Sequence, residues 1–417
     1  MVKITDMRHK PTRRLFLKTT GTFATSSALA LSRAAAALAA EPPDKALGTL
    51  PQVDVLLRAA VGAEDVPGVV AMAATETGVV YEGAFGSRRI HEGPVMTRDT
   101  IFRVASMVKL ITSVAALRLV EQGKLSLEAP VPEIDPVILL THTAGFVYRL
   151  WDADALKYYR AIDKLPMADR SHLPRNPLMF DPGERWQYGG NIDWVGRIVQ
   201  AVSGEPLDAH FRKHIFEPLG MSDTGFVISP AQRAREASGH RRQFDGSLQA
   251  EPMEHLSKQS PPPQSFTGGG GIYSSAPDYL TLVRMLMNGG ALDGVRILQP
   301  DTVALMGQNQ IGRLDVGVLR TTTPAVSRDV DFFPGRKLKW GFGHMLTLEP
   351  VPEGRSAGSL TWAGIYNTYY WIDPKTRIAA VFMTQVLPFA DDRVLGVYRR
   401  FERGIYAAIK AGYVKAN

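Results

Sequence analysis

The chain has 417 residues with 45% hydrophobic content, which is enough for a large core or for two lobes. It contains no cysteine, which excludes disulfides, metal thiolates, a cysteine nucleophile and a lipid anchor on cysteine. The net charge is +7, but residues 1–40 hold seven Lys or Arg and one Asp, a net +6 that leaves about +1 for the remainder. No basic patch interleaved with aromatic residues is visible in that remainder, so we expect no nucleic-acid partner.

Residues 1–40 are predicted to be a twin-arginine export signal. Arg13 and Arg14 precede Phe-Leu-Lys, and a mildly apolar stretch follows that ends in small residues, as at a cleavage site. Lys18 and Arg33 interrupt any run of the ~20 apolar residues that a membrane span requires. The alternative interpretation is a disordered basic tail. With export, we expect a periplasmic or otherwise exported protein that keeps no stable membrane anchor after the signal is removed.

The remaining residues, 41–417, are predicted to form a single domain. Strands are expected at both ends of this domain and helices between them. The expected strands are residues 69–74, 79–85, 339–348, 360–364, 366–372 and 377–384, and the expected helices are residues 53–61, 106–123, 193–203, 277–288 and 391–411. This order predicts an α/β (α+β) fold with one antiparallel sheet of chain-distant strands, flanking helices and an inserted, mainly helical lobe. A cleft between sheet and lobe is the expected place for the site.

Ser106 and Lys109 form the first candidate for catalytic chemistry. They are three residues apart at the start of an apolar helix, so their side chains share one helix face. A serine hydroxyl is a poor nucleophile without a base, and a lysine serves as that base only if burial lowers its pKa. The alternative is that Ser106 caps the helix while Lys109 reaches solvent.

Three further stretches bear on the site. Tyr188 stands just before a predicted helix, and without further context it is an ordinary half-buried tyrosine. The four glycines of residues 268–271 are interpreted as a tight backbone turn, because no Gly-Lys-Ser/Thr follows as in a phosphate loop. His142 is interpreted as structural. No Gly-x-Ser-x-Gly elbow is present and no His-x-x-x-His spacing suits a hydrolytic zinc site, so neither a metal nor a cofactor is expected.

Taken together, these stretches resemble the serine β-lactamase and penicillin-binding protein superfamily, in particular its class C branch and the related family VIII carboxylesterases. The resemblance covers most of residues 41–417. It rests on Ser-Met-Val-Lys at 106–109, Leu-Leu-Thr-His-Thr-Ala-Gly at 139–145, Tyr-Gly-Gly at 188–190, the segment 268–279 and Trp-Ala-Gly at 362–364. It implies a β-lactamase/transpeptidase-like fold.

The resemblance also implies roles for individual residues. Ser106 would be the nucleophile, and Lys109 with Tyr188 a coupled base and acid. The backbone N–H groups of Ser106 and of Ile365, just beyond Gly364, would form the oxyanion hole.

Two positions depart from the β-lactamase pattern. Class C enzymes have Tyr-x-Asn, whereas here Gly190 stands two residues after Tyr188 and Asn191 comes one step late. Class C enzymes also have Lys-Thr-Gly beside the serine, where the lysine attracts a substrate carboxylate; here Trp362 occupies the position of that lysine. The related carboxylesterases carry a tryptophan there, and a neutral aromatic wall favours uncharged acyl groups.

The sequence therefore predicts an exported serine hydrolase that cleaves small carboxylic esters through an acyl-serine intermediate. The expected partner is a small ester or amide substrate. Two alternatives stay open within the enzyme class: a β-lactamase or D-Ala-D-Ala carboxypeptidase, and a transacylase. A further alternative is a non-catalytic relative that binds peptidoglycan fragments or acyl compounds as a sensor.

Overall fold

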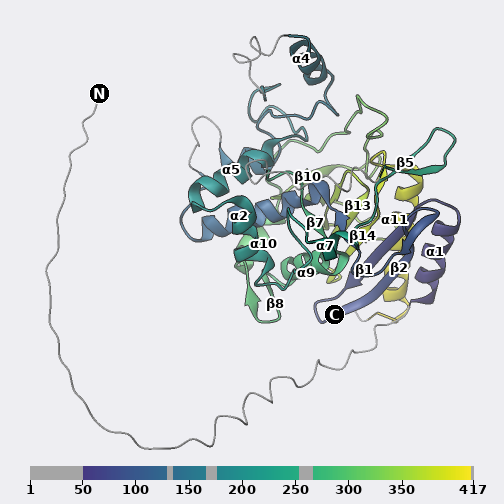
Figure 1. Cartoon of the computed structure of the whole chain (residues 1–417). Helices are drawn as coiled ribbons and strands as arrows, with labels where there is room; N and C mark the ends of the chain where they lie inside the picture. The colour runs from purple at the N-terminus through teal and green to yellow at the C-terminus, as the bar shows by residue number, and fades with distance from the viewer. Residues whose placement is uncertain (1–49, 129–134, 166–175, 253–265, 415–417) are drawn as a thin grey trace, which may run out of the picture. The chain divides into compact units, whose positions relative to one another are not determined.

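Figure 1 shows the chain as a computed structural model, which describes residues 50–128, 135–165, 176–252 and 266–414. Residues Leu47–Asn417 form one compact unit. The expected export signal, residues 1–40, lies outside the described residues. Within the described residues, no helix combines the length and the apolar character that crossing a membrane requires.

One antiparallel sheet of eight strands occupies the centre of this unit. The strands lie in the order β10-β11-β12-β13-β14-β1-β2-β3. Their bounds are β1 (Gly68–Ala74), β2 (Val79–Arg89), β3 (Glu92–Val95), β10 (Leu338–Trp340), β11 (Met345–Thr347), β12 (Leu360–Gly364), β13 (Thr368–Asp373) and β14 (Ile378–Met383). Strands from the two ends of the chain meet in the middle of the sheet, where Val70 pairs with Met383. The expectation of a sheet built from chain-distant strands is confirmed.

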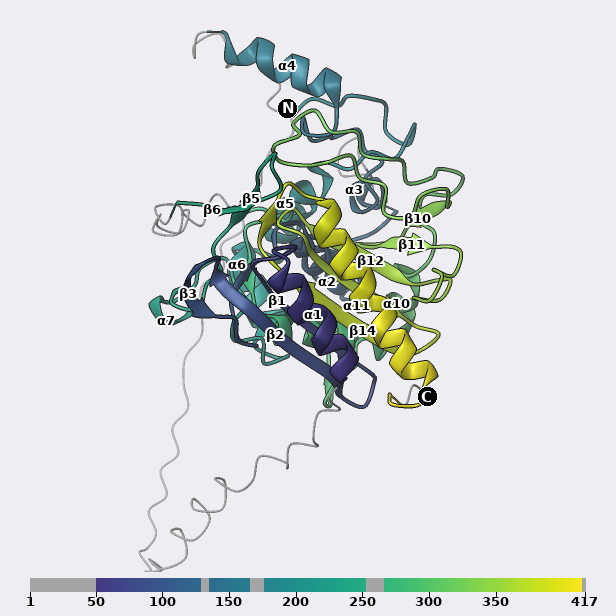
Figure 2. The ribbon, with the colours of Figure 1, turned by 90° about the vertical axis from the view of Figure 1, so that its right-hand side faces the viewer.

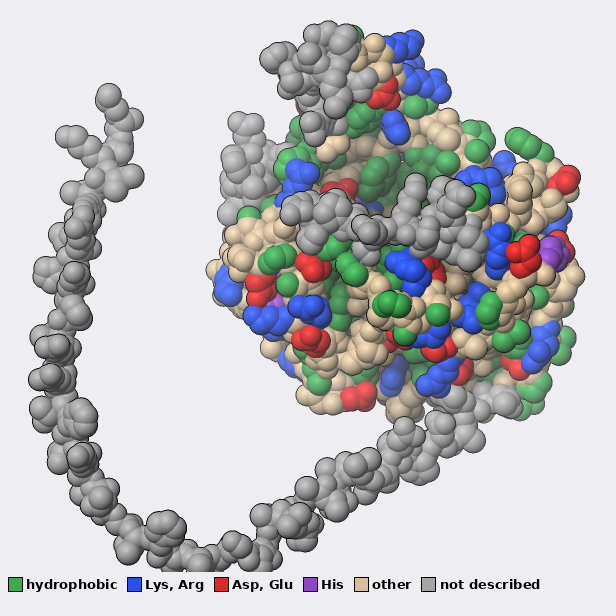
Figure 3. Space-filling view, viewed as in Figure 1, with side chains coloured by type: hydrophobic (Ala, Val, Ile, Leu, Met, Phe, Trp, Pro, Cys, Tyr) green, Lys and Arg blue, Asp and Glu red, His purple; other side chains and the backbone are tan. Residues whose placement is uncertain are grey.

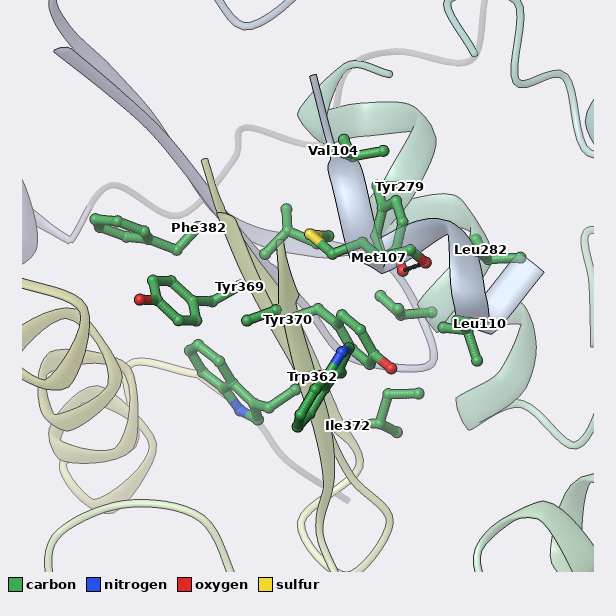
Figure 4. Packing of buried hydrophobic residues seen from close by; sticks show 14 of the residues in the cluster. Val104, Met107, Leu110, Tyr279, Leu282, Trp362, Tyr369, Tyr370, Ile372 and Phe382 are labelled. Carbon is green, nitrogen blue, oxygen red and sulfur yellow. Dashed lines mark hydrogen bonds between the residues drawn. The ribbon is translucent and has the colours of Figure 1, made fainter. Parts of the chain in front are cut away.

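The central strands are apolar because both faces of the sheet are covered. Every residue of β1 and of β14 is buried, as is typical of strands that run beneath helices on both sides. On one face, α1 (Pro51–Gly62) and α11 (Asp392–Lys410) pack against each other over the sheet (Figure 2). On the other face, α9 (Ala276–Met287) packs against β13, β14 and β1 (Figure 4).

A helical lobe is inserted between the strands of the two chain ends. Its elements are α2 (Val108–Glu121), α3 (Pro136–Leu140), α4 (Ala153–Asp163), α5 (Asn191–Ser203), α6 (Leu207–Phe211), the π-helical turn η3 (Arg212–Phe216) and α7 (Pro230–Arg233). The lobe follows β4 (Phe102–Arg103) and precedes β5 (His240–Arg242). In its core, α5 packs against both α2 and α6. This arrangement confirms the expected helical insertion.

Smaller elements complete the unit. They are the 3-10 turn η1 (Ala105–Met107), β6 (Leu248–Ala250), β7 (Tyr273–Ser274), β8 (Ala291–Leu292), β9 (Val295–Arg296), α10 (Pro300–Met306) and β15 (Val386–Leu387). Of these, β7 pairs with β4. The pairing ties the chain just before η1 to the strand that leads into α9.

Helix α2 runs through the core, as its sequence predicts. Eleven of its 14 residues are buried, including Thr112 and Ser113, so the helix has almost no solvent face. Figure 4 shows Leu110 of α2 and Leu282 of α9 on the α9 side of the sheet, with Tyr370 of β13 nearby. Burial of this helix fixes its N-terminal end, where Ser106 lies, against the sheet.

One predicted strand is wrong in extent. Residues 339–348 do not form a single strand but a hairpin of β10 and β11, in which Trp340 pairs with Met345. Glycines make the reversal possible. Gly343 has a φ of 87°, and a Cβ on Gly341 would meet the carbonyl oxygen of Met306. The apolar run of the sequence continues across this turn and hides it.

Candidate active site

Ser106 lies in η1, the 3-10 turn that leads into α2, and its residue is half-buried. The preceding Ala105 has a φ of 45°, a left-handed conformation that costs free energy for a residue with a side chain. Two contacts hold the turn: Tyr279 of α9 donates to the Met107 carbonyl over 2.9 Å, and Val104 N–H donates to the Ile272 carbonyl over 3.1 Å. Ser106 is therefore part of a rigid turn and does not cap the helix.

Lys109 faces Ser106 from the first turn of α2 and does not reach solvent. Its side chain is buried, with 1% exposure of the residue. Its Nζ donates to Ser106 Oγ over 3.2 Å and to the Gly269 carbonyl over 2.8 Å. The spacing of three residues thus brings the amine and the hydroxyl together as the sequence predicts.

The condition for Lys109 to act as the base, a pKa lowered by burial, is not met. Burial, the largest single influence, does lower this pKa. It is outweighed by the tyrosines Tyr148 and Tyr188 and by the Asp193 carboxylate, which together hold the pKa of Lys109 above its ordinary value. The rings of Tyr148 and Tyr188 lie 5.3 Å and 4.9 Å from Lys109 Nζ, within the range of a cation–π contact. Lys109 is thus an ammonium ion at neutral pH, and a positive charge stands beside Ser106 Oγ.

Tyr188 lies next to Lys109, in the loop before α5. It is 2% exposed, and its hydroxyl accepts a hydrogen bond of 3.2 Å from the indole Nε1 of Trp362. The rings of Tyr188 and Trp362 are 4.8 Å apart. The structure therefore brings together Ser106, Lys109, Tyr188 and Trp362, four residues that come from three separate parts of the sequence.

Tyr148 is a member of this cluster that sequence reasoning missed. Its ring lies 5.5 Å from that of Tyr188, and burial is the main cause that raises the pKa of its hydroxyl. In the sequence it is one of several aromatic residues in an irregular loop. No helical or strand period marks the position, so the only signal was the aromatic richness of the segment.

His142 packs against the Tyr188 ring, but its side chain has no hydrogen bond to Ser106, Lys109 or Tyr188. Its ring is fully buried, 4.7 Å from the Tyr188 ring and 5.1 Å from the Trp340 ring. Its Nδ1 is 3.2 Å from Nδ2 of Asn191, and its carbonyl accepts from Gln187 N–H. Burial, followed by the charge of Lys109, holds the pKa of His142 well below its usual range, so the ring is neutral. These contacts support the loop that carries Tyr188.

Asn191 does not restore the amide that is missing at Gly190. Its side chain is fully buried, and Nδ2 donates to the Phe146 carbonyl over 2.8 Å. The amide thus belongs to the packing between α5 and the loop after α3. Glycine is needed at Gly189, because a Cβ there would meet the backbone of Phe146.

Gly364 ends β12 directly against the Ser106 turn. A Cβ at this position would meet both the carbonyl oxygen of Val104 and the hydroxyl of Thr368, so only glycine allows the strand to come so close. The next residue, Ile365, lines one cavity together with Ser106, Tyr188 and Trp362. Ser106 and Ile365, the two residues expected to supply the oxyanion hole, therefore line the same cavity.

The cavity itself is small. Its volume is about 10 Å³, and besides the residues named it is lined by Trp151, Leu319, Ala363 and Phe389. A larger space of about 180 Å³ adjoins it at Trp362 and Leu319. Figure 3 shows a hollow lined by hydrophobic side chains below the part of the molecule that carries α4.

The glycine-rich run packs against α2 and α5 and contacts no ligand group. Gly268 accepts from Thr112 Oγ1 over 2.7 Å, and Gly269 N–H donates to the Asp193 carboxylate over 2.8 Å. A Cβ on Gly268 would meet the Ile192 carbonyl. Glycines are therefore needed here because the backbone comes close to α2 and α5, and this close packing brings the Gly269 carbonyl to Lys109 Nζ. The expected tight turn is thus also a packing contact.

The fold and this cluster define an enzyme of the β-lactamase-like serine hydrolase class. The profile of the beta-lactamase family matches residues 53–404, and the chain belongs to that family. The superfamily and fold predicted from the sequence are confirmed.

Named relatives include enzymes with different reactions. Lovastatin esterase of Penicillium rubens is 29% identical over 401 residues, which cover 86% of this chain and 99% of that protein. Monacolin J acid methylbutanoyltransferase of Aspergillus terreus is 28% identical, over 86% of this chain and 96% of that protein. The solved structure of simvastatin synthase LovD from Aspergillus terreus has a TM-score of 0.74 at 27% identity and covers 86% of this chain and 98% of that one.

Proposed function

We propose that this protein is an exported carboxylesterase that cleaves small, uncharged esters through an acyl intermediate on Ser106. The observation that carries the proposal is the position of Trp362. Its indole lines the Ser106 cavity, at the place where the resemblance to class C enzymes would put a lysine, and its Nε1 is bound to Tyr188. The esterase among the relatives supports the same reaction type.

Proton transfer in this proposal runs between Ser106 and Tyr188. Lys109, held as an ammonium, stabilises the negative charge that develops on Ser106 Oγ during this transfer. Tyr188 takes the Ser106 proton as the Oγ–carbon bond forms. The N–H groups of Ser106 and Ile365 hold the resulting oxyanion. Tyr188 then returns the proton to the leaving alcohol, and water repeats the cycle on the acyl-serine.

Trp362 is the expected source of selectivity for uncharged over negatively charged substrates. A substrate carboxylate at this wall would lose a charge-assisted hydrogen bond of roughly 1.5 to 3 kcal/mol relative to a lysine. An uncharged group gains contact with an apolar surface, because Trp362 also packs against Trp340 at 4.6 Å and Phe332 at 5.7 Å between ring centroids. Neutral esters are therefore preferred to β-lactams and D-Ala-D-Ala peptides, both of which carry a carboxylate.

The volume of the cavity beside Ser106 limits the size of the acyl group that we expect the enzyme to accept. A volume of about 10 Å³ beside Ser106 holds only about one water-sized group. Trp151 and Phe389, which close it, are both buried, and their ring centroids are 6.3 Å apart. We therefore expect acetyl esters to react faster than butyryl esters.

The test compares kcat/KM of the purified protein for p-nitrophenyl acetate, p-nitrophenyl butyrate and a chromogenic cephalosporin. We expect acetate to exceed butyrate and both to exceed the cephalosporin, with Ser106→Ala as the background control. Preference for the cephalosporin would replace the esterase proposal with a β-lactamase. Stable acylation of Ser106 without turnover of any substrate would replace it with a sensor.

Acyl transfer to an alcohol is the second candidate function. A space of about 220 Å³ lies beside Tyr148 and is lined by Phe146, Arg149, Asp193 and Trp194, among others. It adjoins the catalytic cluster through Tyr148 and is large enough for an acceptor alcohol, and one relative is named as an acyltransferase. Adding a primary alcohol to the acetate assay distinguishes the two: formation of the new ester in excess of free acetate would favour transfer.

Export by the twin-arginine route is supported by Arg13, Arg14 and the small residues before position 41. Replacing Arg13 and Arg14 with Lys keeps the charge and removes the arginine pair. We expect this variant to remain as precursor in the cytoplasm, whereas the unchanged chain reaches the periplasm in processed form. Periplasmic processing of the Lys-Lys variant would rule out this route.

A further inference from the structure

Three potential metal ligands gather at the C-terminal end of α5, away from the catalytic cluster. Glu205 follows Gly204, which closes α5 in a left-handed conformation with a φ of 71°. His210 lies on α6, and His214 lies in the π-helical turn η3 that continues it. The ligand atoms of the three residues all lie within 4.8 Å of one another.

The carboxylate of Glu205 stands between the two rings. Its Oε2 is 2.9 Å from Nδ1 of His210 and 2.9 Å from Nε2 of His214. The rings are 4.5 Å apart between centroids. In a tetrahedral zinc site with bonds of about 2.0 to 2.2 Å, neighbouring ligand atoms are roughly 3.3 to 3.5 Å apart. Small rotations of the three side chains would therefore make room for an ion among these atoms.

The backbone favours this convergence. Histidines four residues apart share one face of a helix, and π-helical turns are rare and occur often at functional sites. The turn η3 comprises Arg212–Phe216 and therefore contains His214. At the end of α5, Ser203 Oγ accepts a hydrogen bond from Glu205 N–H over 3.2 Å and so fixes the backbone of Glu205.

The donor set suits zinc. Two imidazole nitrogens and one carboxylate oxygen are ligands that zinc prefers, whereas magnesium and calcium prefer sites made of oxygen ligands.

Two cations lie near the cluster, and zinc would bind beside them. Lys213 binds Oε1 of Glu205 at 2.6 Å, so Oε2 remains for a metal while the lysine fixes the carboxylate from the other side. Arg118 of α2 is the other cation that acts on His210. Solvent reaches the cluster, since the side chains of Glu205 and His214 are 25% and 22% exposed, whereas that of His210 is only 3% exposed.

We propose that Glu205, His210 and His214 form a zinc site that clips α6 and η3 to the end of α5. Three protein ligands leave the fourth position of a tetrahedral zinc ion to water, and the proposed role of the ion is to hold these elements together. Helix α5 has 13 residues and therefore a length of about 20 Å, and Tyr188 precedes its first residue while Glu205 follows its last. Zinc at this position stabilises the fold without touching Ser106. The proposal replaces the expectation that the chain holds no metal, and the His-x-x-x-His spacing of His210 and His214 is its signal in the sequence.

The test uses the purified full chain after removal of metal with a chelator. Zinc is titrated in competition with a chromogenic chelator, and bound metal is counted by elemental analysis. We expect one zinc ion per chain and a rise of a few degrees in Tm with zinc, but no rise with magnesium. Esterase kcat/KM should be the same with and without zinc.

Variants locate the site. His214→Gln and Glu205→Gln should each weaken zinc binding by at least about tenfold and abolish the rise in Tm. His91→Gln is the matched control, because His91 is also near a carboxylate, 3.4 Å from Glu64 Oε1, but its side chain is 67% exposed and it forms only a pair. Absence of stoichiometric zinc in the unchanged chain, or unchanged affinity in His214→Gln, would overturn the proposal.

Discussion

Trp362 donates a hydrogen bond from its indole nitrogen to the hydroxyl oxygen of Tyr188, over 3.2 Å. A donor aimed at a phenol oxygen stabilises negative charge on that oxygen. The same indole forms a wall of the cavity that contains Ser106. One residue therefore acts on two properties at once: the charge of the substrate that fits the cavity and the hydrogen bonding of the Tyr188 oxygen.

Trp362→Lys and Trp362→Phe separate these two properties. Lysine offers a substrate carboxylate a cation, so it should narrow the gap in kcat/KM between p-nitrophenyl acetate and the cephalosporin. Phenylalanine keeps the apolar wall and loses only the indole donor, so it should lower kcat for the acetate while the preference between the two substrates is kept. A cephalosporin rate that does not improve in Trp362→Lys would argue against the wall as the source of charge selectivity.

Ser106 is expected to be the residue that carries the acyl group. Ser106→Ala should abolish labelling by a fluorophosphonate probe and reduce turnover to background, because the hydroxyl is removed while the buried turn is kept. Ser126→Ala serves as the control, since Ser126 follows α2 and its Oγ accepts a hydrogen bond from the backbone N–H of Glu128. Labelling that persists in Ser106→Ala would place the nucleophile elsewhere.

Tyr188 and Tyr148 are expected to contribute unequally. Tyr188→Phe should lower kcat by on the order of 10³, as should Lys109→Ala, because members of one catalytic unit fail together. Tyr148→Phe should cost less, since its ring contacts Lys109 and Tyr188 but it has no hydrogen bond to Trp362. The control is Tyr159→Phe, whose hydroxyl donates to Asn176 at an exposed position. A larger loss in Tyr148→Phe than in Tyr188→Phe would exchange their roles.

The catalytic cluster shows where sequence reasoning succeeds and where it stops. Ser106 and Lys109 are close in sequence on one helix, so helix geometry alone brings them together. Tyr188 and Trp362 are 174 residues apart, and only the resemblance to a family could place them at one site. Tyr148 carries no motif, and its role follows from the loop packing that brings it against Lys109. The pKa of Lys109 depends on those same neighbours, and burial alone predicts its direction wrongly.

The fold shows a similar division. Long elements with a clear apolar period were predicted within a few residues; α5, for example, was expected at 193–203 and begins at Asn191. The short strands β10 and β11 were merged, because apolar residues continue through the turn between them. Only Gly341 and Gly343 mark that turn, and a glycine within an apolar run does not by itself indicate a reversal.

Asp278 gives a prediction about pH and stability. It lies in the first turn of α9, and its Oδ2 accepts from Asp223 N–H over 2.7 Å and from Thr224 Oγ1 over 2.8 Å. Burial is the main cause that raises its pKa from 3.8 to about 6. A carboxyl whose pKa is raised by folding stabilises the folded state below its unfolded pKa, and this contribution is lost as pH rises through the folded value.

Asp278→Asn should therefore change the shape of the stability profile. Asparagine is never charged and still offers an oxygen to Asp223 and Thr224. Relative to the unchanged chain, its free energy of unfolding should increase between pH 4 and pH 7, by at most roughly 3 kcal/mol for a shift of about two pKa units. Urea unfolding at several pH values measures this difference. A constant difference over that range would show that Asp278 does not titrate as described.

The pairing of Val70 with Met383 determines when this protein can acquire its structure. β1 is among the first segments to leave the ribosome, and its neighbour β14 is among the last. Until residues 378–383 have been synthesised, the apolar edge of β1 has no partner on that side, and α9 and α11 have no complete sheet to cover. The serine turn against β12 is likewise assembled late. For most of its synthesis, a nascent chain of this protein therefore exposes apolar strand residues that the finished sheet buries.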